Sequence, residues 1–460
     1  MTIVATDPAT GRELSRHTRH SDTDVEAILS GATKAQADWR RRPIAERTPL
    51  LQAVARVLRD NRDQYAALIT AEMGKPIGEA LAEIDKCALT CDYYADTAAV
   101  HLADRTVASD ASDSAVVYDP LGVVLAIMPW NYPFWQFFRF AAPALAAGNA
   151  TLLKHANNVP GCARAVEDVL RRAGAPDGLC RTLLIDVKQV ADLIADPRVS
   201  AITLTGSTQV GAIVASQAAA ELKKQVLELG GSDPFIVLAD ADVAQAAATA
   251  AKARFVNNGQ SCVNAKRFIV EEAVADEFAR LFTEHTAALT VGDPTDPATD
   301  LGPLARTDLR TALHDQVTRS LAGGAELLLG GELPDGDGCF YPPTVLDHVR
   351  PGTAAFDEET FGPLAAITLV PNTETALALA NRTEYGLGAA LWTTDLDRAR
   401  RLARELDAGA VFINGMVASD PRLPFGGIKK SGYGRELGAE GIREFVNTKT
   451  VWIGPKTDAA

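Results

Sequence analysis

Short runs of β-branched and apolar residues alternate with longer amphipathic segments from about Val116 onward, and this alternation is what most constrains the fold. Strands that alternate with helices form βαβ units, which build a parallel sheet covered by helices on both faces. Such a sheet binds ligands outside the carboxyl ends of its strands. In this first set we expect strand Leu121–Met128, helix Pro160–Ala173, and strands Leu179–Ile185, Ala201–Thr205 and Gln225–Leu229.

A second set of the same kind follows, and helices precede the first. The later elements are expected at Phe235–Leu238, Val243–Phe255, Phe268–Val270, Val274–Leu289, Gly409–Asn414 and Thr448–Ile453. Thr48–Thr70 and Ile84–Leu102 carry apolar residues at helical spacing, whereas the Gly/Pro-rich segment Leu423–Gly434 is expected to be a loop. The 460 residues suffice for about three domains, or two large ones with an appendage. The sequence therefore predicts an α/β protein.

The acidic charge balance disfavours polyanionic partners. Lys and Arg number 45 and Asp and Glu 59, which gives a formal net charge of −14. Nucleic acid and anionic membrane surfaces prefer a basic face, so neither is an expected partner. No apolar run reaches the roughly 18 residues of a membrane span, and the N-terminal residues lack the basic and apolar regions of a signal peptide. We expect a cytoplasmic protein.

The six cysteines are scattered, with no CxxC pair and no Cys/His cluster of zinc spacing. No metal site is therefore expected, and six free thiols are the simplest interpretation in a cytosolic chain. Cys262 ends Asn257–Cys262, NNGQSC, where small polar residues indicate a loop. A loop thiol is a candidate nucleophile if a dipole or a cation stabilises its thiolate, although a lone cysteine is more often structural.

Three further features are candidates for chemistry, and each has an ordinary structural alternative. Glu228 lies in the apolar strand end Val226–Gly231, where burial would raise its pKa and suit it to general-base catalysis, unless it is held by a salt bridge or backbone N–H groups. Asn131, bracketed by two prolines, can aim its amide at an oxyanion or be a turn residue. Gly206 and Ser207 follow a strand and begin a helix, which favours a phosphate or merely caps the helix.

Seven short motifs, in this order, resemble the aldehyde dehydrogenase superfamily over essentially the whole chain. They are PWN at Pro129–Asn131, Lys154 in LLKHAN, GSTQVG at Gly206–Gly211, LELGG at Leu227–Gly231, NNGQSC at Asn257–Cys262, EETFGP at Glu358–Pro363 and LPFGG at Leu423–Gly427. Longer stretches, such as MPWNYPFWQ and FINGMVASDPRLPFGGIKKSGYGRE, are most similar to bacterial succinate-semialdehyde dehydrogenases of this superfamily.

The resemblance implies three parts. A Rossmann-like cofactor-binding domain is expected over residues 1–100 and 121–229, and an α/β catalytic domain with Cys262 over residues 230–430. Residues 101–120 and 431–460 are expected to form a small β oligomerisation arm and tail, whose strands extend the sheet of a neighbouring copy in a homodimer or homotetramer.

The resemblance also implies what the matching residues do. Cys262 attacks the aldehyde carbon, Asn131 and the Cys262 backbone N–H hold the oxyanion, hydride passes to the nicotinamide ring, and Glu228 activates the water that hydrolyses the thioester. The residues expected to contact the cofactor are Trp130, Lys154, Asn157, Gly206, Ser207, Leu229, Glu359 and Phe361.

Asn157 favours NADP as that cofactor, with NAD as the alternative. Many NAD-preferring relatives have glutamate at this position, three residues after Lys154, where it holds the ribose hydroxyls. A carboxylate repels a 2′-phosphate, whereas an amide can donate a hydrogen bond to it. We therefore expect NADP to be accepted and preferred.

The expected substrate is a small aldehyde, in particular succinic semialdehyde. Arg139 is a charge in an apolar stretch, and related enzymes suggest that it binds the distal carboxylate, assisted by Gln136 and Ser419 and beside Trp135. The alternative is an arginine paired with a carboxylate or with helix-end carbonyls inside the fold.

Other functions stay open on the sequence. The enzymatic alternatives are a broad-specificity aldehyde dehydrogenase for aliphatic or aromatic aldehydes and, less in keeping with Glu228, a CoA-acylating enzyme. The alternative from a different class is a catalytically silent binding member of the fold, against which intact Cys262, Glu228 and Asn131 argue.

Overall fold

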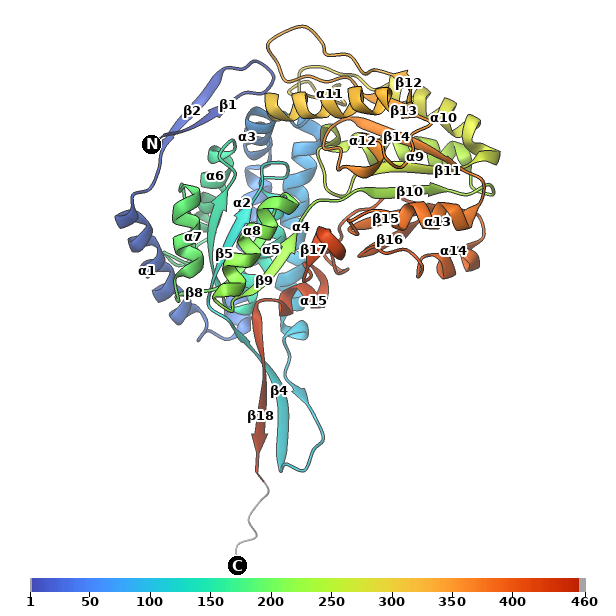
Figure 1. Ribbon diagram of the computed structural model, residues 1–460. Helices are drawn as coiled ribbons and strands as arrows, with labels where there is room; N and C mark the ends of the chain where they lie inside the picture. Colours follow the sequence, from blue (N-terminus) through green and yellow to red (C-terminus); the bar gives the residue numbers. More distant parts are fainter. Residues whose placement is uncertain (1, 455–460) are drawn as a thin grey trace, which may run out of the picture.

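The computed structural model describes residues 2–454, in which two sheets lie side by side and an arm projects away from both (Figure 1). A hairpin of β1 (Thr2–Thr6) and β2 (Glu13–Thr18) comes first. Four helices follow, α1 (Asp22–Trp39), α2 (Ile44–Asp60), α3 (Arg62–Met73) and α4 (Ile77–His101). Within residues 2–454 we find no helix with both the length and the apolarity of a membrane span.

The first sheet has six strands in the order β17-β9-β8-β5-β6-β7, and all neighbours are parallel except the short edge strand β17. The strands are β5 (Val123–Met128), β6 (Ala150–His155), β7 (Cys180–Thr182), β8 (Val199–Thr205), β9 (Lys224–Glu228) and β17 (Gly432–Tyr433). The connecting helices are α5 (Trp135–Ala147), α6 (Pro160–Arg172), α7 (Val187–Ala195) and α8 (Thr208–Ala220). Because β5, β8 and β9 are parallel, the loops after them bring Asn131, Ser207 and Leu229 to one edge of the sheet.

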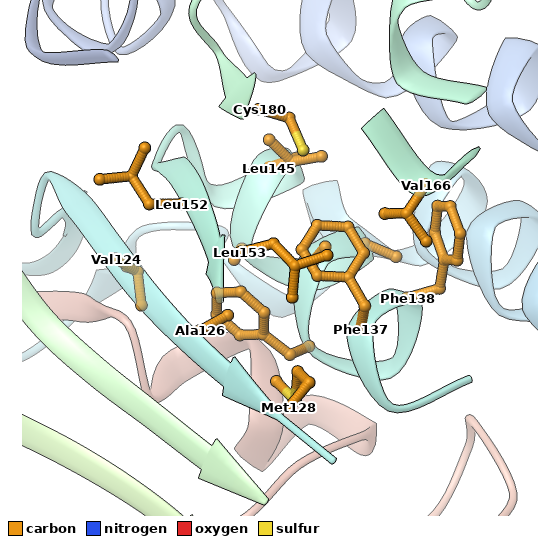
Figure 2. Close-up of a cluster of buried hydrophobic side chains, with 14 of the residues drawn as sticks. Val124, Ala126, Met128, Phe137, Phe138, Leu145, Leu152, Leu153, Val166 and Cys180 are labelled. Atoms are coloured by element: carbon orange, nitrogen blue, oxygen red, sulfur yellow. The ribbon is translucent and has the colours of Figure 1, made fainter. Parts of the chain in front are cut away.

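Apolar packing on this sheet fixes the loop that carries Asn131. All 13 residues of α5 are buried, and so is every residue of β5 except Ile127. Phe137 and Phe138 of α5 belong to the same buried cluster as Leu153 of β6 and Val166 of α6 (Figure 2). Burying each such side chain contributes about 1.5–3 kcal/mol relative to exposure. The helix and the strand on either side of Asn131 are therefore held rigidly.

The second sheet has seven strands in the order β12-β13-β14-β11-β10-β15-β16, parallel except for the pair β12 and β13. The strands are β10 (Asp233–Val237), β11 (Ala265–Glu271), β12 (Glu326–Leu329), β13 (Thr344–Asp347), β14 (Leu364–Val370), β15 (Gly388–Trp392) and β16 (Ala410–Ile413). The helices are α9 (Val243–Phe255), the 3₁₀ turn η1 (Val256–Gly259), α10 (Glu272–Ala287), α11 (Thr307–Ala322), α12 (Ala354–Asp357), α13 (Thr373–Asn381) and α14 (Leu396–Leu402). The edge strand β16 is half-buried along its whole length.

The arm is a three-stranded sheet that projects from the body (Figure 1). β18 (Val446–Ile453) pairs antiparallel with β4 (Asp113–Pro120), which pairs in turn with β3 (Arg105–Thr106). The short helices η2 (Lys429–Ser431) and α15 (Gly438–Arg443) lead into it. Residues 455–460 of the expected tail lie outside the described residues.

The structure corrects three expected elements. The expected helix Thr48–Thr70 is interrupted at Asn61, whose φ of −122° leaves the helical region and whose side-chain amide donates to the Val57 carbonyl at 2.8 Å. The expected strand Leu179–Ile185 forms only as β7. The expected loop Leu423–Gly434 ends in η2 and β17, because Gly432 and Tyr433 pair with β9. The other expected strands and helices overlap observed ones.

Candidate active site

A cavity of about 440 Å³ lies between the first sheet and the loop of Cys262. Ten residues singled out in the sequence line it: Trp130, Asn131, Gln136, Lys154, Gly206, Ser207, Leu229, Cys262, Glu359 and Phe361. The rings of Trp130 and Phe361 meet edge to face with centroids 5.9 Å apart. The Arg306 guanidinium, at the start of α11, lies over the Trp130 ring, 5.8 Å from its centroid. The sequence does not predict this residue.

The turn before Cys262 is anchored by side chains that bond to distant backbone. Asn257 and Asn258 of η1 adopt left-handed φ angles of 57° and 56°. The Asn258 amide donates to the carbonyls of Gly74 and Pro303, each at 2.9 Å. The Asn257 amide donates to the Asn131 carbonyl at 2.9 Å. These bonds hold the Cys262 turn against the Asn131 loop.

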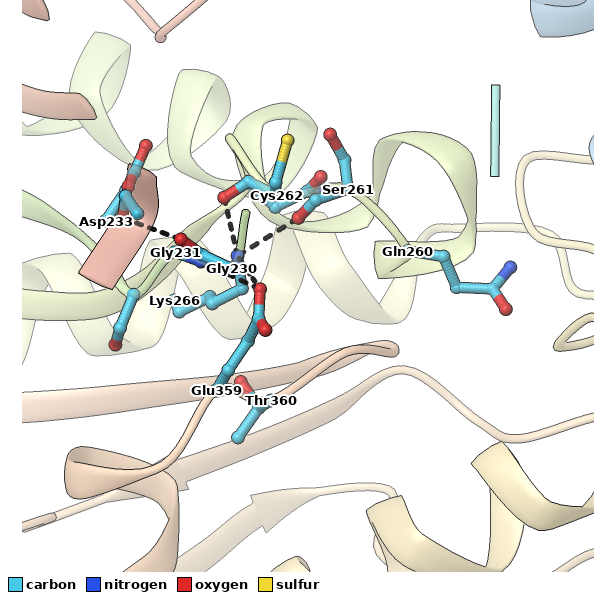
Figure 3. A network of polar contacts seen from close by, with 12 residues as sticks. Gly230, Gly231, Asp233, Gln260, Ser261, Cys262, Lys266, Glu359 and Thr360 are labelled. Carbon is cyan, nitrogen blue, oxygen red and sulfur yellow. Dashed lines mark hydrogen bonds and ion pairs between the residues drawn. The ribbon is translucent and has the colours of Figure 1, made fainter. Parts of the chain in front are cut away.

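Lys266 links the cysteine turn to Glu359 (Figure 3). Its ammonium donates to the Ser261 and Cys262 carbonyls at 3.0 and 2.8 Å and lies 3.9 Å from the Glu359 carboxylate. Glu359 also accepts the Gly231 backbone N–H at 2.9 Å. Glu359 is therefore fixed at the cavity wall by a buried cation and a backbone donor.

The Cys262 side chain is half-buried, whereas the other five cysteines are buried and all six are free thiols. Burial raises the pKa of the Cys262 thiol to about 12, against the opposing effect of the cations Arg139 and Lys266. In this structure the thiol is therefore protonated at neutral pH, and the proton must be removed before sulfur can attack.

Asn131 is oriented by its neighbours. Its amide nitrogen donates one hydrogen to the Gln260 carbonyl at 2.9 Å, and its oxygen accepts from the Gln136 amide at 2.9 Å. This network assigns the nitrogen to the side of the Cys262 turn. The second amide hydrogen has no acceptor among residues 2–454.

Glu228 lies in a buried group with Glu436 and Arg139. Arg139 forms an ion pair with Glu436 and also donates to the Thr205 hydroxyl at 3.3 Å. Burial and then the Glu436 carboxylate raise the pKa of Glu228 well above its usual range. Since the Arg139 guanidinium pairs with Glu436, Glu228 is the carboxyl whose ionised form is disfavoured by both burial and a neighbouring negative charge. Arg139 thus has the intramolecular partner that the sequence left as its alternative role.

The far end of the cavity is basic. Ser207 caps α8 by accepting the Val210 backbone N–H at 3.4 Å, and Lys154 lies at the end of β6. Burial, and then the charge of Arg19, lower the pKa of Lys154. Two nitrogens of Arg19, Nε and Nη1, are buried with no hydrogen-bond partner. Asn157, two residues after β6, is exposed and does not line the cavity.

Two of the expected substrate residues lie around a lysine that the sequence did not single out. The Lys86 ammonium, from α4, donates to the Ser419 hydroxyl at 2.7 Å and lies over the Trp135 ring at 4.4 Å from its centroid. Gln136 instead faces Asn131 in the cavity.

The residues missed from the sequence, Arg19, Lys86, Lys266, Arg306 and Glu436, are charged side chains without a local signature. The available signal for Lys266 is a group of charged residues within β11, AKRFIVE, whose neighbouring apolar residues predict a buried strand. Among residues 2–454 no group of three or more His, Cys, Asp or Glu side chains could hold a metal ion.

Comparisons with known proteins agree with this architecture. The model of the aldehyde dehydrogenase family matches residues 1–451. The chain is 53% identical over 453 residues to the probable succinate-semialdehyde dehydrogenase (NADP+) of Synechocystis sp., covering 98% of this chain and 100% of that protein. It is 49% identical to the succinate semialdehyde dehydrogenase (NAD(P)+) Sad of Escherichia coli, covering 98% and 97%.

Among solved structures, that of succinic semialdehyde dehydrogenase from Streptococcus pyogenes in complex with NADP+ superposes with a TM-score of 0.96 at 38% identity, covering 98% of this chain and 100% of that one. The chain has the fold of these enzymes, which confirms the resemblance in its sequence. It belongs to the aldehyde dehydrogenase family.

Proposed function

We propose that this aldehyde dehydrogenase oxidises succinic semialdehyde to succinate with NADP as hydride acceptor. The observation that carries the proposal is the convergence of Cys262 and Asn131 on a cavity that Lys154 also lines, with the unpartnered Arg19 guanidinium close enough to Lys154 to lower its pKa. Relatives that match the whole chain are named for this substrate. In the overall reaction the aldehyde, oxidised cofactor and water give the acid, reduced cofactor and protons.

The first half of the reaction uses Cys262 and Asn131. The thiol gives its proton to a water molecule, and a bond forms between its sulfur and the aldehyde carbon, which leaves a negative charge on oxygen. The free amide hydrogen of Asn131 and the Cys262 backbone N–H donate to that oxygen. When bound, NADP supplies an oxidised nicotinamide ring that accepts the hydride from this carbon. Cys262 then carries a thioester.

Glu228 serves the second half. As a carboxylate it takes a proton from a water molecule, which attacks the thioester carbon; the carbon–sulfur bond breaks and the thiolate is restored. The raised pKa of Glu228 makes it a stronger base when it is ionised, but it also delays ionisation to higher pH. Glu228 is therefore expected to set the low-pH limit of deacylation.

The basic end of the cavity fits the 2′-phosphate of NADP. Two nitrogens of Arg19 have no hydrogen-bond partner, and Lys154 carries a further positive charge. Among residues 2–454 neither side chain forms an ion pair with a carboxylate. Such buried donors are costly unless a ligand satisfies them. Lys154 and Arg19 would hold the phosphate, and Ser207 with the start of α8 would face the pyrophosphate, whereas Asn157, outside the cavity lining, could reach the phosphate only from the exposed side.

The assembly and location that we propose are a homodimer or homotetramer in the cytoplasm. The outer edge of β18 and the outer edge of β16 are both free of a strand within the described chain, so each can add a strand from a second copy. Six free cysteines suit a reducing compartment.

Initial rates of absorbance change at 340 nm test the activity. Succinic semialdehyde is compared with butanal, a neutral aldehyde of the same length, with NADP and NAD in parallel and succinate assayed as the product. We expect turnover to favour the semialdehyde and NADP. Equal turnover of butanal would leave a broad-specificity aldehyde dehydrogenase, and a tenfold preference for NAD in kcat/KM would reject the cofactor assignment.

A further inference from the structure

The turn that carries Cys262 is bonded by a glutamate of α4. The Glu79 carboxylate accepts the backbone N–H of Asn257 at 2.7 Å. Asn257 and Asn258 both have left-handed φ angles, a conformation that residues with a side chain keep only where the surrounding structure holds it. The bond from Glu79 is therefore one of the contacts that fix the turn.

The same part of α4 also bonds to the loop that carries Asn131. Glu83, four residues after Glu79, accepts the backbone N–H groups of Phe134 and Trp135, each at 2.9 Å. These two residues begin α5 and follow Asn131 closely. Residues four apart lie on the same face of a helix. Two carboxylates on one face of α4 therefore hold the two loops that carry the reacting groups.

Lys75, just before α4, neutralises one of these carboxylates and not the other. Its buried ammonium pairs with Glu83 and lies 3.8 Å from the centroid of the Tyr132 ring. Among residues 2–454 Glu79 forms no ion pair within 4.0 Å, and its side chain has one hydrogen bond, to the N–H of Asn257. A salt bridge thus does not account for Glu79, whereas its bond to the cysteine turn does.

Glu79 is reached from a cavity other than the one that contains Cys262. This second cavity has a volume of about 380 Å³, and its charged lining residues are Glu79, Lys252, His285 and Asp300. The two cavities share no lining residue. Because Glu79 is half-buried and the other three residues are exposed, its proton exchanges with solvent without passing the reacting atoms.

We propose that Glu79 is a positioning residue for acylation, whose carboxylate holds the N–H of Asn257 and thereby keeps Cys262 aligned with Asn131. The inference rests on the proposed function, in which sulfur attacks while the Asn131 amide holds the oxyanion. Small displacements of reacting groups cost large factors in rate. Glu79 lines neither the substrate nor the cofactor side of the larger cavity, so it acts through the turn.

The strength of the bond depends on the charge of Glu79. Burial raises the pKa of Glu79 to about 7, against the opposing charge of Lys75. A carboxylate accepts a stronger hydrogen bond than a neutral carboxyl or amide, so the bond weakens as pH falls through 7. The charged and titratable groups that face Glu79 or line its cavity are Lys75, Tyr132, Lys252, His285 and Asp300.

The burst of p-nitrophenolate from p-nitrophenyl acetate tests the proposal, because it measures acylation of Cys262 without the cofactor and before water attacks. Glu79→Ala should lower the burst rate constant by about tenfold or more at pH 8 and remain slower at pH 6. Glu79→Gln keeps a neutral acceptor, so it should be about threefold slower than the wild type at pH 8 and equal to it at pH 6. Deprotonation of Cys262 affects all three proteins alike, so their ratios report on Glu79.

Glu46→Ala is the matched control. Glu46 is the third residue of α2, as Glu79 is of α4, and both helices follow a proline. Glu46 is exposed, so its removal takes the same charge from a helix start without a contact to the cysteine turn. Glu46→Ala should keep the wild-type burst rate at both pH values.

The outcomes separate this inference from the proposed function. A wild type without a burst would overturn the acylation step, and the inference with it. A wild-type burst that Glu79→Ala retains would overturn the inference alone, and so would equal slowing of Glu79→Ala and Glu79→Gln at both pH values. Should Glu79→Ala not fold, the ratio of wild type to Glu79→Gln decides: convergence at pH 6 supports the positioning role, and a constant ratio overturns it.

Discussion

At the scale of single residues, the site contains more buried carboxyl groups than paired cations. Glu228 and Glu436 are both buried, and Arg139 is the guanidinium that pairs with one of them. Burial and the charge of Glu436 therefore both favour the protonated form of Glu228, and removal of the Glu436 charge would lower the pKa of Glu228. The sequence does not predict the pairing of Arg139 with Glu436, because Arg139 lies in α5 and Glu436 lies far along the chain, between β17 and α15.

Glu436→Gln should move the acid limb of deacylation to lower pH. The substitution removes the carboxylate that raises the pKa of Glu228 and frees Arg139, whose positive charge lowers that pKa. Because Glu228 acts when ionised, a lower pKa extends its activity to lower pH, by about one pH unit. The pH profile for hydrolysis of p-nitrophenyl acetate, which acylates a cysteine without the cofactor, measures this. The exposed Glu440→Gln is the control, and an unmoved limb in Glu436→Gln would contradict the argument.

Arg19→Ala should weaken binding of NADP by about tenfold and leave NAD unchanged, because it removes one charge-assisted contact to the 2′-phosphate. Titration calorimetry of the free enzyme with NADP, NAD and 2′-AMP measures the effect without turnover. Arg16→Ala is the matched control, since Arg16 lies three residues earlier in β2, is exposed and pairs with Glu13 at 2.5 Å. Equal weakening of NADP and NAD would assign Arg19 to the shape of the cleft rather than to the phosphate.

At the scale of elements, hydrophobic periodicity predicts those helices and strands whose apolar residues recur at regular spacing. The buried run Leu121–Met128 became β5, and the amphipathic run Val243–Phe255 is α9 with the expected bounds. The break between α2 and α3 and the pairing of β17 with β9 were not predicted, because an asparagine in a helical pattern and two residues of a glycine-rich loop carry no periodic signal. The same limit applies to Lys86, whose partner Ser419 comes from another segment.

The connection between α8 and β9 contains a residue with a strained backbone conformation and an exposed side chain. Leu222 has a φ of 56° and is 94% exposed. A left-handed conformation costs a residue with a Cβ roughly 1–2 kcal/mol, a cost that glycine avoids. Leu222→Gly should therefore raise the free energy of unfolding by about 1 kcal/mol, read as a higher urea midpoint.

The control for Leu222→Gly is an equally drastic change at a helical position. Val187, the first residue of α7, is 81% exposed, and glycine there removes a side chain without relieving strain. Val187→Gly should be neutral or destabilising. A loss of stability in both variants would show that the exposed Leu222 side chain, and not its backbone angle, matters at the end of α8.

At the scale of the whole molecule, the arm exposes apolar side chains and a free strand edge that no other part of the described chain covers. β4 and β18 project from the body, and Val451, Trp452 and Ile453 are 41%, 50% and 53% exposed on a strand with a free edge (Figure 1). Natural sheets protect such edges. In the homodimer or homotetramer that we propose, the matching edge is β16 of a second copy, which is half-buried and ends the second sheet.

The double variant Val451→Lys with Ile453→Lys should therefore dissociate the assembly. The two positions are two residues apart on β18 and share a face of the arm, so paired ammonium groups would oppose association while β18 keeps its ladder with β4. Light scattering after size exclusion should give the mass of one chain for this variant and of two or four chains for the wild type. Leu14→Lys, on the N-terminal hairpin and 43% exposed, is the control and should keep the wild-type mass. If the double variant keeps it as well, the arm serves some other contact and its apolar surface is not what joins the subunits.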